Sequence, residues 1–433
     1  MKRKLGSFET AQAVTNENFP FNAVLILRIT NGPSENTLKQ VISLLQRRQP
    51  MLRVCLEKNK KQYFFQSENT PSIPLRMVER KSDEHWKEVA EEELNHIIDY
   101  QTGPLARLTY IIGKNGEQER EIIITVHHAV IDAPSGGNLI HELLYLCSQV
   151  ESHTLSKEPA IFEMIPSAEE LFPSSFKGMN RRWHNLLFFF RQMRDEFQYR
   201  RRTKGRRTAP IHAEGRGRIL PMVLSTETTE ILCRTARKKR ITLNSLFAAS
   251  ILIAVHKHLY KNQNQPLRNF SFANLRPYLK PPIGDEYLGS CFSMMRYTIG
   301  LREDPQIWEL AGEINDIVYT SVKRGDKFCS NLLSLPMMRA ILRFKAFRMG
   351  TTAVSYTGPL SIDRDYGNIK VKQIHAFVSN FVLGPEYTAQ TRLFDKQFYW
   401  DILYLDSDMK EDEARIIADE IRGILDTAAK EDA

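Results

Sequence analysis

The run IIITV at residues 122–126 constrains the fold more than any other stretch of this chain. All five residues are β-branched, which is typical of a buried strand. The run leads into His127 and His128, Asp132 follows shortly after, and the Pro and Gly residues within 133–137 are expected to break the strand. A strand that delivers titratable groups at its carboxyl end and then stops is a common way to build an active site.

The two histidines cannot share one role, because neighbouring strand residues point to opposite faces of a sheet. One can face a channel while the other packs behind it. Histidine titrates near neutral pH and suits removal of a proton from a hydroxyl or an amine. The alternative is that His127 and His128 are both hydrogen-bonded strand-end residues without a chemical role. Asp132 is near enough to shape the turn or to take a charged partner, and the spacing leaves both open.

The stretch HHAVID at 127–132 resembles the HHxxxD motif of the chloramphenicol-acetyltransferase-like superfamily. That superfamily includes nonribosomal peptide condensation domains, mycobacterial polyketide-associated acyltransferases, alcohol acetyltransferases and plant BAHD enzymes. Its members carry the motif at a similar depth in a chain of this length.

Other segments resemble the same superfamily in the same order along the chain. Residues 47–53 (RRQPMLR) resemble its RHPxLR segment, with Gln49 where histidine usually stands. Residues 274–277 (NLRP), 288–293 (LGSCFS) and 354–360 (VSYTGPL) resemble its NLRP, LGNxxS and xSNxGP segments. The resemblance therefore covers essentially the whole chain, by motif order and spacing more than by extended identity.

The resemblance implies an α/β (mixed α+β) fold of two chloramphenicol-acetyltransferase-like lobes, each a mixed sheet flanked by helices, with an active-site tunnel between them. A length of 433 residues also favours two lobes over one core. We place the N-terminal lobe at 1–178, a basic crossover linker or helix at 179–215 and the C-terminal lobe at 216–433. Periodicity predicts helices at 35–49, 83–98, 138–149, 226–239, 243–259, 304–325 and 411–428, and strands at 21–29, 104–111, 218–224, 371–379, 388–394 and 397–405.

The resemblance also assigns roles to residues of the motif. In the family, the second histidine deprotonates the acceptor, which then attacks a thioester carbonyl without a covalent acyl-enzyme. That role falls on His128, with His127 as a supporting residue. Asp132 would be structural and would pair with an arginine of the second lobe, for which Arg276 is the candidate. The alternative for Arg276 is a surface or phosphate-binding arginine.

Further positions are expected to shape the site. Ser355 or Thr357 could supply a hydroxyl to the oxyanion, although such strand-end residues often bond only the backbone. Gly136 and Gly137 would permit the turn into the helix. Ala133 stands where the family usually has glycine, and its methyl group is expected to narrow or redirect the channel. The DFGWG motif of plant BAHD enzymes is absent, which favours the bacterial free-standing branches.

Composition excludes several classes of protein. No apolar run approaches the ~20 residues that span a bilayer, and the N-terminus lacks an apolar signal region. The five cysteines are far apart and show no CxxC spacing. They favour reduced thiols and a cytoplasmic protein over a disulfide framework, and no metal site is expected.

The excess positive charge is concentrated in one segment. Residues 181–207 hold ten basic and two acidic residues and so carry +8 of the net charge of +9. The rest of the chain is close to neutral, which argues against nucleic-acid binding. The segment is interpreted either as a linker or surface helix, or as a basic amphipathic helix that contacts anionic lipid or an acidic carrier protein.

These observations predict an acyltransferase of lipid or secondary-metabolite biosynthesis. Its donor would be acyl-CoA or an acyl-carrier protein, so that a CoA or phosphopantetheine thioester is a co-substrate and no cofactor is bound permanently. The acceptor would be a small or lipid-like alcohol or amine. We expect a cytoplasmic monomer, with membrane association through 181–207 left open. The alternatives are an inactive condensation-like recruitment module and a peripheral membrane adaptor.

Overall fold

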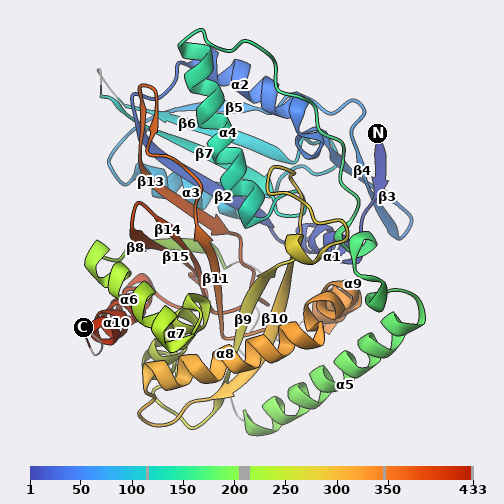
Figure 1. Cartoon of the computed structure of the whole chain (residues 1–433), viewed down its shortest axis with the longest axis vertical. Coiled ribbons are helices and arrows are strands. Elements are labelled where there is room, and N and C mark those ends of the chain that lie inside the picture. The colour runs from blue at the N-terminus through green and yellow to red at the C-terminus, as the bar shows by residue number, and fades with distance from the viewer. Residues whose placement is uncertain (114–116, 204–214, 345–347, 431–433) are drawn as a thin grey trace. The chain divides into compact units, whose positions relative to one another are not determined.

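The motif strand lies inside a six-stranded sheet of a computed structural model that describes residues 1–113, 117–203, 215–344 and 348–430 (Figure 1). The strand order is β12-β13-β2-β7-β6-β5, and β7 ends at the first histidine. Only β5 and β6 pair in parallel, so the sheet is mixed. The bounds are β2 Asn22–Thr30, β5 Leu75–Glu79, β6 Ala106–Ile112, β7 Glu119–His127, β12 Asp365–Tyr366 and β13 Ile369–Val378.

Helices cover both faces of this first sheet. The helices α2 (Glu35–Arg48) and α4 (Ala133–Glu151) pack together, while α3 (His85–Asn95) packs against β2 and β7. The predicted cap of α2 is present, because the Ser34 hydroxyl accepts a hydrogen bond from the Thr37 amide at 3.1 Å. The other elements that belong with the first sheet are α1 Ser7–Asn16, β1 Lys2–Lys4, η1 Pro50–Arg53, β3 Cys55–Asn59, β4 Gln62–Gln66, η2 Ala168–Leu171 and η4 Arg276–Tyr278.

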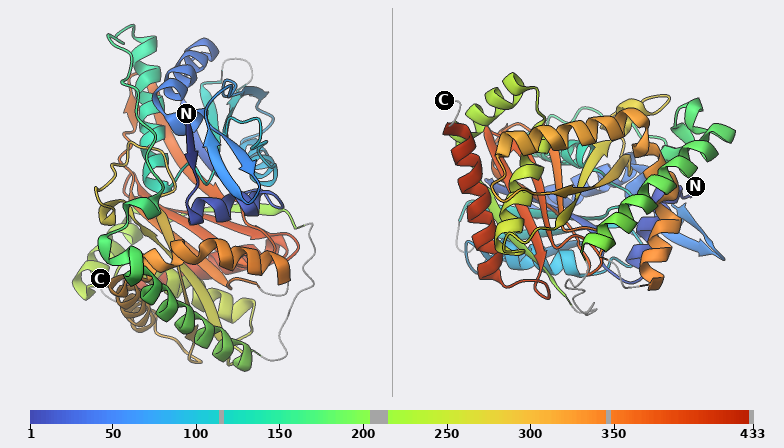
Figure 2. Two further views of the ribbon diagram at one scale, coloured as in Figure 1. Left: turned by 90° about the vertical axis from the view of Figure 1, so that its right-hand side faces the viewer. Right: turned by 90° about the horizontal axis from the view of Figure 1, so that it is seen from below.

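The second sheet is also six-stranded and mixed, in the order β10-β9-β11-β14-β15-β8. Its strands are β8 Gly217–Val223, β9 Pro266–Asn274, β10 Phe292–Gly300, β11 Thr352–Pro359, β14 Tyr387–Phe394 and β15 Gln397–Leu405. Its helices are η3 Ser174–Phe176, α5 Gly178–Arg202, α6 Thr226–Lys239, α7 Leu243–His258, α8 Ile307–Arg324, α9 Asp326–Phe344 and α10 Glu411–Lys430. The two views in Figure 2 show α5 alongside α9, with which it packs.

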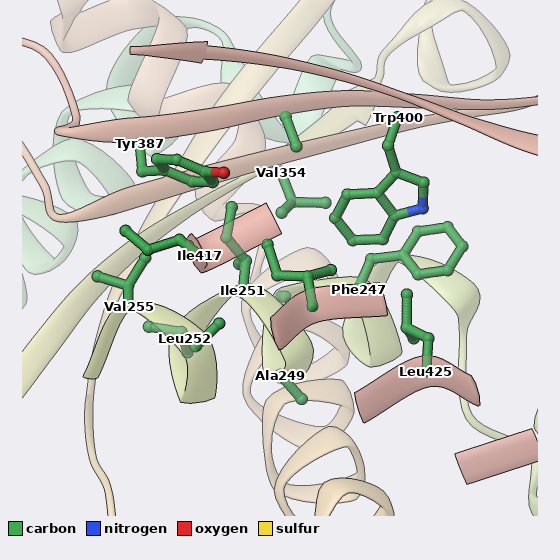
Figure 3. Packing of buried hydrophobic residues seen from close by; sticks show 14 of the residues in the cluster. Phe247, Ala249, Ile251, Leu252, Val255, Val354, Tyr387, Trp400, Ile417 and Leu425 are labelled. Carbon is green, nitrogen blue, oxygen red and sulfur yellow. The ribbon is translucent and has the colours of Figure 1, made fainter. Parts of the chain in front are cut away.

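The core of the second sheet forms around α7. Apart from Ser250, its residues 246–255 are apolar on all sides, as expected of a helix segment that is buried in a core. The ring centroids of Phe247 and Trp400 lie 4.9 Å apart, and aliphatic side chains of α7 and α10, such as Ile251 and Leu425, lie to one side of the pair (Figure 3). The predicted fold class, two lobes that each hold a mixed sheet flanked by helices, is thereby confirmed.

The two compact units are not contiguous in sequence. The first comprises Met1–Leu171, Arg276–Cys291 and Pro359–Ser379, and the second comprises the remaining segments. The ranges 1–178, 179–215 and 216–433 that we placed from the sequence differ from these units. The difference arises because β13 pairs along its length with β2 in the first sheet, and because side chains of the first unit hold residues 276–291.

No helix within the described ranges combines the length and the apolar character needed to cross a membrane. Of the basic segment, residues 181–203 lie in α5 and just beyond it, whereas Lys204, Arg206 and Arg207 fall outside the described residues.

Candidate active site

His128 follows directly after β7 and is partly exposed. Its backbone amide donates to the Phe21 carbonyl at 2.9 Å, and its ring stacks on Phe21 with centroids 5.7 Å apart. Ring nitrogen Nδ1 lies 2.9 Å from the carbonyl oxygen of Ile131. A carbonyl can only accept a hydrogen bond, so Nδ1 carries the proton and Nε2 carries the lone pair of the neutral ring. The side chain is thus in the tautomer that a general base on Nε2 requires.

Although His128 is partly exposed, the burial of most of its surface lowers its pKa below the ordinary value of 6.5, and the hydrogen bond to Ile131 and the Asp132 carboxylate oppose this shift. The net direction means that the ring is neutral at physiological pH. A neutral imidazole can accept a proton, which is the property the proposed chemistry needs.

His127 is placed differently, although it is the adjacent residue. Thr125, two residues earlier on β7, hydrogen-bonds Glu93 of α3, and strand alternation turns His127 towards the same face. Its side chain is fully buried, and Nδ1 accepts a hydrogen bond from the Ala129 amide at 3.0 Å. Burial, helped by the neighbouring His128, lowers the pKa of His127 to about 3. This histidine is therefore a neutral core residue that helps to shape the turn after β7.

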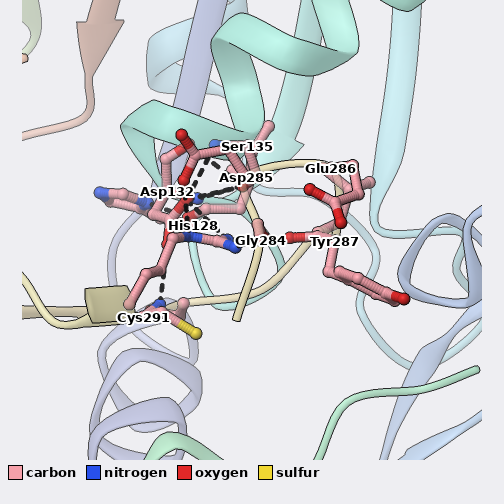
Figure 4. A network of polar contacts seen from close by, with 12 residues as sticks. His128, Asp132, Ser135, Gly284, Asp285, Glu286, Tyr287 and Cys291 are labelled. Carbon is pink, nitrogen blue, oxygen red and sulfur yellow. Dashed lines mark hydrogen bonds and ion pairs between the residues drawn. The ribbon is translucent and has the colours of Figure 1, made fainter. Parts of the chain in front are cut away.

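Asp132 occupies the centre of a buried polar network (Figure 4). It is the N-cap of α4: its Oδ1 accepts from the Ser135 amide at 3.0 Å and from the Ser135 hydroxyl at 2.7 Å. Oδ2 accepts from the Cys291 amide at 3.0 Å. Arg276 donates from Nη2 to Oδ1 and from Nε to Oδ2, both at 3.0 Å. Five hydrogen bonds to one carboxylate indicate a structural role, in which Asp132 both shapes the turn and takes the charged partner.

Arg276 joins this network to the segment at 276–291. Its side chain is 1% exposed, and its guanidinium also donates to the backbone carbonyls of Gly284 and of Tyr287, the latter at 2.8 Å. The predicted pair of Asp132 and Arg276 is thus present as a buried ion pair. The expectation that Arg276 comes from the second lobe is wrong, because its segment belongs to the first unit.

The start of α4 also differs from the expectation. The helix begins at Ala133 and not near Asn138, with Pro134 in its first turn. Pro is favoured there because its missing N–H would have no intrahelical partner. Gly136 and Gly137 lie inside the helix and do not form the turn that leads into it. Asp132, acting as the N-cap, starts the helix earlier than the Pro and Gly pattern predicted.

Two glutamines that carried no predicted role hold residues 276–291 in place. Gln49 is 1% exposed, and its Nε2 donates to the Glu286 carbonyl at 2.8 Å. Gln12 of α1 donates to the Ser290 hydroxyl at 3.1 Å. The position of Gln49 in the segment that resembles RHPxLR was the one sequence signal for this contact. The contact itself depends on residues more than 230 positions away.

The other predicted site residues are distributed over both units. Ser355 and Thr357 lie on β11 in the second unit, where the Thr357 hydroxyl donates to the Thr391 carbonyl at 3.3 Å. Their role as oxyanion donors stays a prediction. Ala133 is exposed at the first position of α4.

The Cys291 side chain is buried next to the same network, in which its backbone amide donates to Asp132. Burial raises the pKa of Cys291 to about 12, which keeps this thiol protonated at neutral pH. Within the described ranges, no group of three or more His, Cys, Asp or Glu side chains is placed to hold a metal ion.

Family models match both halves of the chain. Residues 10–265 match the model described as "Condensation domain". Residues 215–391 match the model described as "Phthiocerol/phthiodiolone dimycocerosyl transferase C-terminus".

Individual proteins show the same similarity at low identity. HC-toxin synthetase of Cochliobolus carbonum is 28% identical over 143 residues, which are 31% of this chain and 3% of that protein. Polyketide synthase associated protein 5 of Mycobacterium tuberculosis superposes with a TM-score of 0.70 at 16% identity, over 99% of this chain and 98% of that one. Trichothecene 15-O-acetyltransferase of Fusarium sporotrichioides superposes with a TM-score of 0.76 at 12% identity, over 98% and 94% of the two chains. At such identities the superpositions establish the fold.

Proposed function

Because the chain belongs to the condensation domain family, we propose that it transfers an acyl group from a thioester to a hydroxyl or amine, with His128 as general base. The family matches support an acyltransferase of secondary metabolism or lipid synthesis. The observation that carries the base assignment is the hydrogen bond from Nδ1 of His128 to the Ile131 carbonyl, which leaves the lone pair on Nε2.

The proposed reaction needs one base and no covalent enzyme intermediate. Nε2 of His128 removes the proton from the acceptor O–H or N–H while the acceptor atom attacks the thioester carbonyl carbon. The tetrahedral intermediate then collapses, and its C–S bond breaks. The leaving thiolate takes the proton back from the His128 imidazolium, so the products are an ester or amide and a free thiol. Asp132 and Arg276 hold the backbone from 128 to 135 in place, and the Asp132 carboxylate also opposes the lowering of the pKa of His128.

We propose acyl-CoA or an acyl-carrier protein as the donor, with a CoA or phosphopantetheine thioester as co-substrate and not as a resident cofactor. A small or lipid-like alcohol or amine is the proposed acceptor. The similarity to polyketide synthase associated protein 5 and to HC-toxin synthetase supports this choice of donor, because their names connect them with polyketide and toxin synthesis.

The test follows thiol release from acyl-CoAs and from acylated carrier protein, with a panel of alcohols and amines. His128→Ala should lower the acceptor-dependent rate by about 10²- to 10⁴-fold, the usual contribution of a general base. His96→Ala, at an exposed histidine of the same unit, is the matched control and should keep the rate. A His128→Ala rate equal to that of the wild type would refute the base assignment. If the wild-type protein released no thiol from any donor, that result would favour the alternative in which the protein is an inactive recruitment module.

A further inference from the structure

Helix α5 carries a stripe of large apolar side chains on its exposed face. Eight of the sixteen large apolar side chains that are exposed among the described residues belong to this one helix. Single exposed apolar residues are ordinary on protein surfaces, whereas a contiguous group marks an interaction site. The centre of the stripe consists of Met179, Trp183, Leu186, Phe190, Met193 and Phe197, which are 43–66% exposed.

The rotation of α5 about its axis is fixed by its opposite face. Phe188 is buried, and Arg268, whose side chain is 2% exposed, pairs with Asp195 at 3.1 Å and with Glu196 at 2.7 Å. Both acidic residues of the helix therefore face its own unit, which also contains Arg268. These contacts fix the side of α5 that packs against its own unit, so the apolar stripe lies on the opposite side of the helix.

The charged side chains that α5 exposes are all arginines. Arg181 and Arg182 lie near the start of the helix, Arg194 lies in its second half, and Arg201 and Arg202 lie in its last turn. By helical spacing, Arg182, Arg194 and Arg201 flank the apolar stripe, whereas Arg181 and Arg202 extend from the two ends of the face that holds Phe188. These five arginines are exposed and form no ion pair with any described residue. The helix thus presents an apolar centre between two cationic ends, which complements an anionic surface that also accepts apolar side chains.

We propose that α5 binds the surface of an anionic lipid membrane, with its apolar stripe in the interface and its arginines at the phosphate groups. Helices that lie in the plane of a membrane carry Trp and Phe on an apolar face and basic residues outside it, and basic residues near an anionic surface strengthen the binding. This inference does not depend on the proposed acyl transfer.

A partner helix fits the stripe less well than a membrane. The six central residues follow the spacing of a coiled-coil seam, but Leu187 and Phe189 widen the apolar face at the flanking positions, where coiled coils carry charges. A second copy of α5 would also bring the arginine-rich ends together in either orientation, which is unfavourable.

Vesicle co-sedimentation of the full chain tests the proposal. Vesicles of phosphatidylcholine alone and of phosphatidylcholine mixed with phosphatidylglycerol serve as the two probes. The wild type should bind the mixed vesicles, and Phe190→Asp should abolish this binding. Ile416→Asp, at a residue of α10 that is 51% exposed, is the matched control and should bind like the wild type. Thermal unfolding should be unchanged in both variants, since both positions are exposed.

Charge and orientation are tested with two more pairs of proteins. Arg201/Arg202→Gln should weaken partition into the mixed vesicles about 30-fold, from the usual effect of two basic residues near an anionic surface. Arg237/Lys238→Gln removes the same charge from the exposed last turn of α6 and should leave partition nearly unchanged. Vesicles should also shift Trp183 fluorescence to the blue in the wild type and not in Trp183→Phe.

Two results would overturn the proposal. One is a wild type that does not sediment with mixed vesicles, or whose sedimentation survives Phe190→Asp. The other is a wild type that stays off vesicles and forms a dimer in solution that Phe190→Asp dissociates, because the stripe would then be a contact between copies. His128→Ala should bind vesicles like the wild type, because the membrane proposal does not involve this residue. A failure of the acyl-transfer proposal can therefore be distinguished from a failure of the membrane proposal.

Discussion

His128 and His127 have the same side chain and adjacent positions, yet their surroundings give them different chemistry. Nδ1 of His128 donates to a carbonyl, whereas Nδ1 of His127 accepts from an amide, so the two rings hold opposite tautomers. The sequence predicted that the two side chains point to opposite faces, because strand alternation is local. It could not predict the tautomers, which depend on where Ile131 and Ala129 lie after the turn.

The pH dependence of the reaction follows from the direction of the His128 shift. Burial lowers the pKa of this ring below 6.5, and the neutral ring is the active form. The rate should therefore be full above about pH 6.5 and should fall only as the pH drops through the lowered pKa of His128. The measurement is kcat/KM as a function of pH, with circular dichroism to confirm that the protein stays folded. An acidic limb centred above pH 6.5 would contradict the assignment.

At the scale of the element, α4 and the segment at 276–291 depend on the same carboxylate. Asp132 caps the helix and pairs with Arg276, so one side chain orients the turn that presents His128 and holds a segment 144 residues away. The sequence indicated an Asp–Arg pair through a family resemblance. Capping chemistry could also have predicted that Asp132, three residues before Ser135, starts the helix. The Pro and Gly residues at 133–137 instead predict a break in the chain before the helix begins.

The pair of Asp132 and Arg276 gives a prediction about stability. Asp132→Ala should destabilise the protein by about 3–5 kcal/mol, because the Arg276 guanidinium is then buried without its counter-charge. Asp132→Ala/Arg276→Leu should recover part of that loss, since no uncompensated charge remains. Chemical denaturation of the single and double variants measures the coupling.

An exposed pair that is also joined by two hydrogen bonds provides the control. Arg76 donates two hydrogen bonds to Glu92, at 2.8 and 2.9 Å, with side chains 42% and 54% exposed. Glu92→Ala should cost less than about 1 kcal/mol, because solvent screens exposed ion pairs. Equal costs for Asp132→Ala and Glu92→Ala would show that burial does not set the strength of the Asp132 pair.

At the scale of the whole molecule, the chain passes between its two units more than once. Residues 276–291 and 359–379 return to the first unit from the second half of the sequence. The sequence predicted two lobes from length and motif order. It did not predict this exchange, because periodicity identifies a strand such as β13 without identifying its neighbour in the sheet.

The exchange predicts that the first unit cannot fold from contiguous residues alone. An isolated fragment of residues 1–178 lacks β13, which leaves one edge of β2 unpaired along most of its length. It also lacks Arg276, the buried partner of Asp132. We expect the fragment to aggregate or remain unfolded, as measured by circular dichroism and size-exclusion chromatography. A monomeric fragment with a cooperative thermal transition would contradict this expectation.

The sequence by itself determined the strand that ends in His127, the apolar faces of the helices, the family and the concentration of positive charge before the second sheet. These features follow from local periodicity, short motifs and composition, which need no knowledge of distant residues. Only the tertiary structure decided the tautomer of His128, the five hydrogen bonds of Asp132 and the outward direction of the α5 stripe. Each of these depends on how backbone and side-chain groups meet after folding, and pairs such as Asp132 with Arg276 or Asp195 with Arg268 are too far apart in sequence for any local pattern to join them.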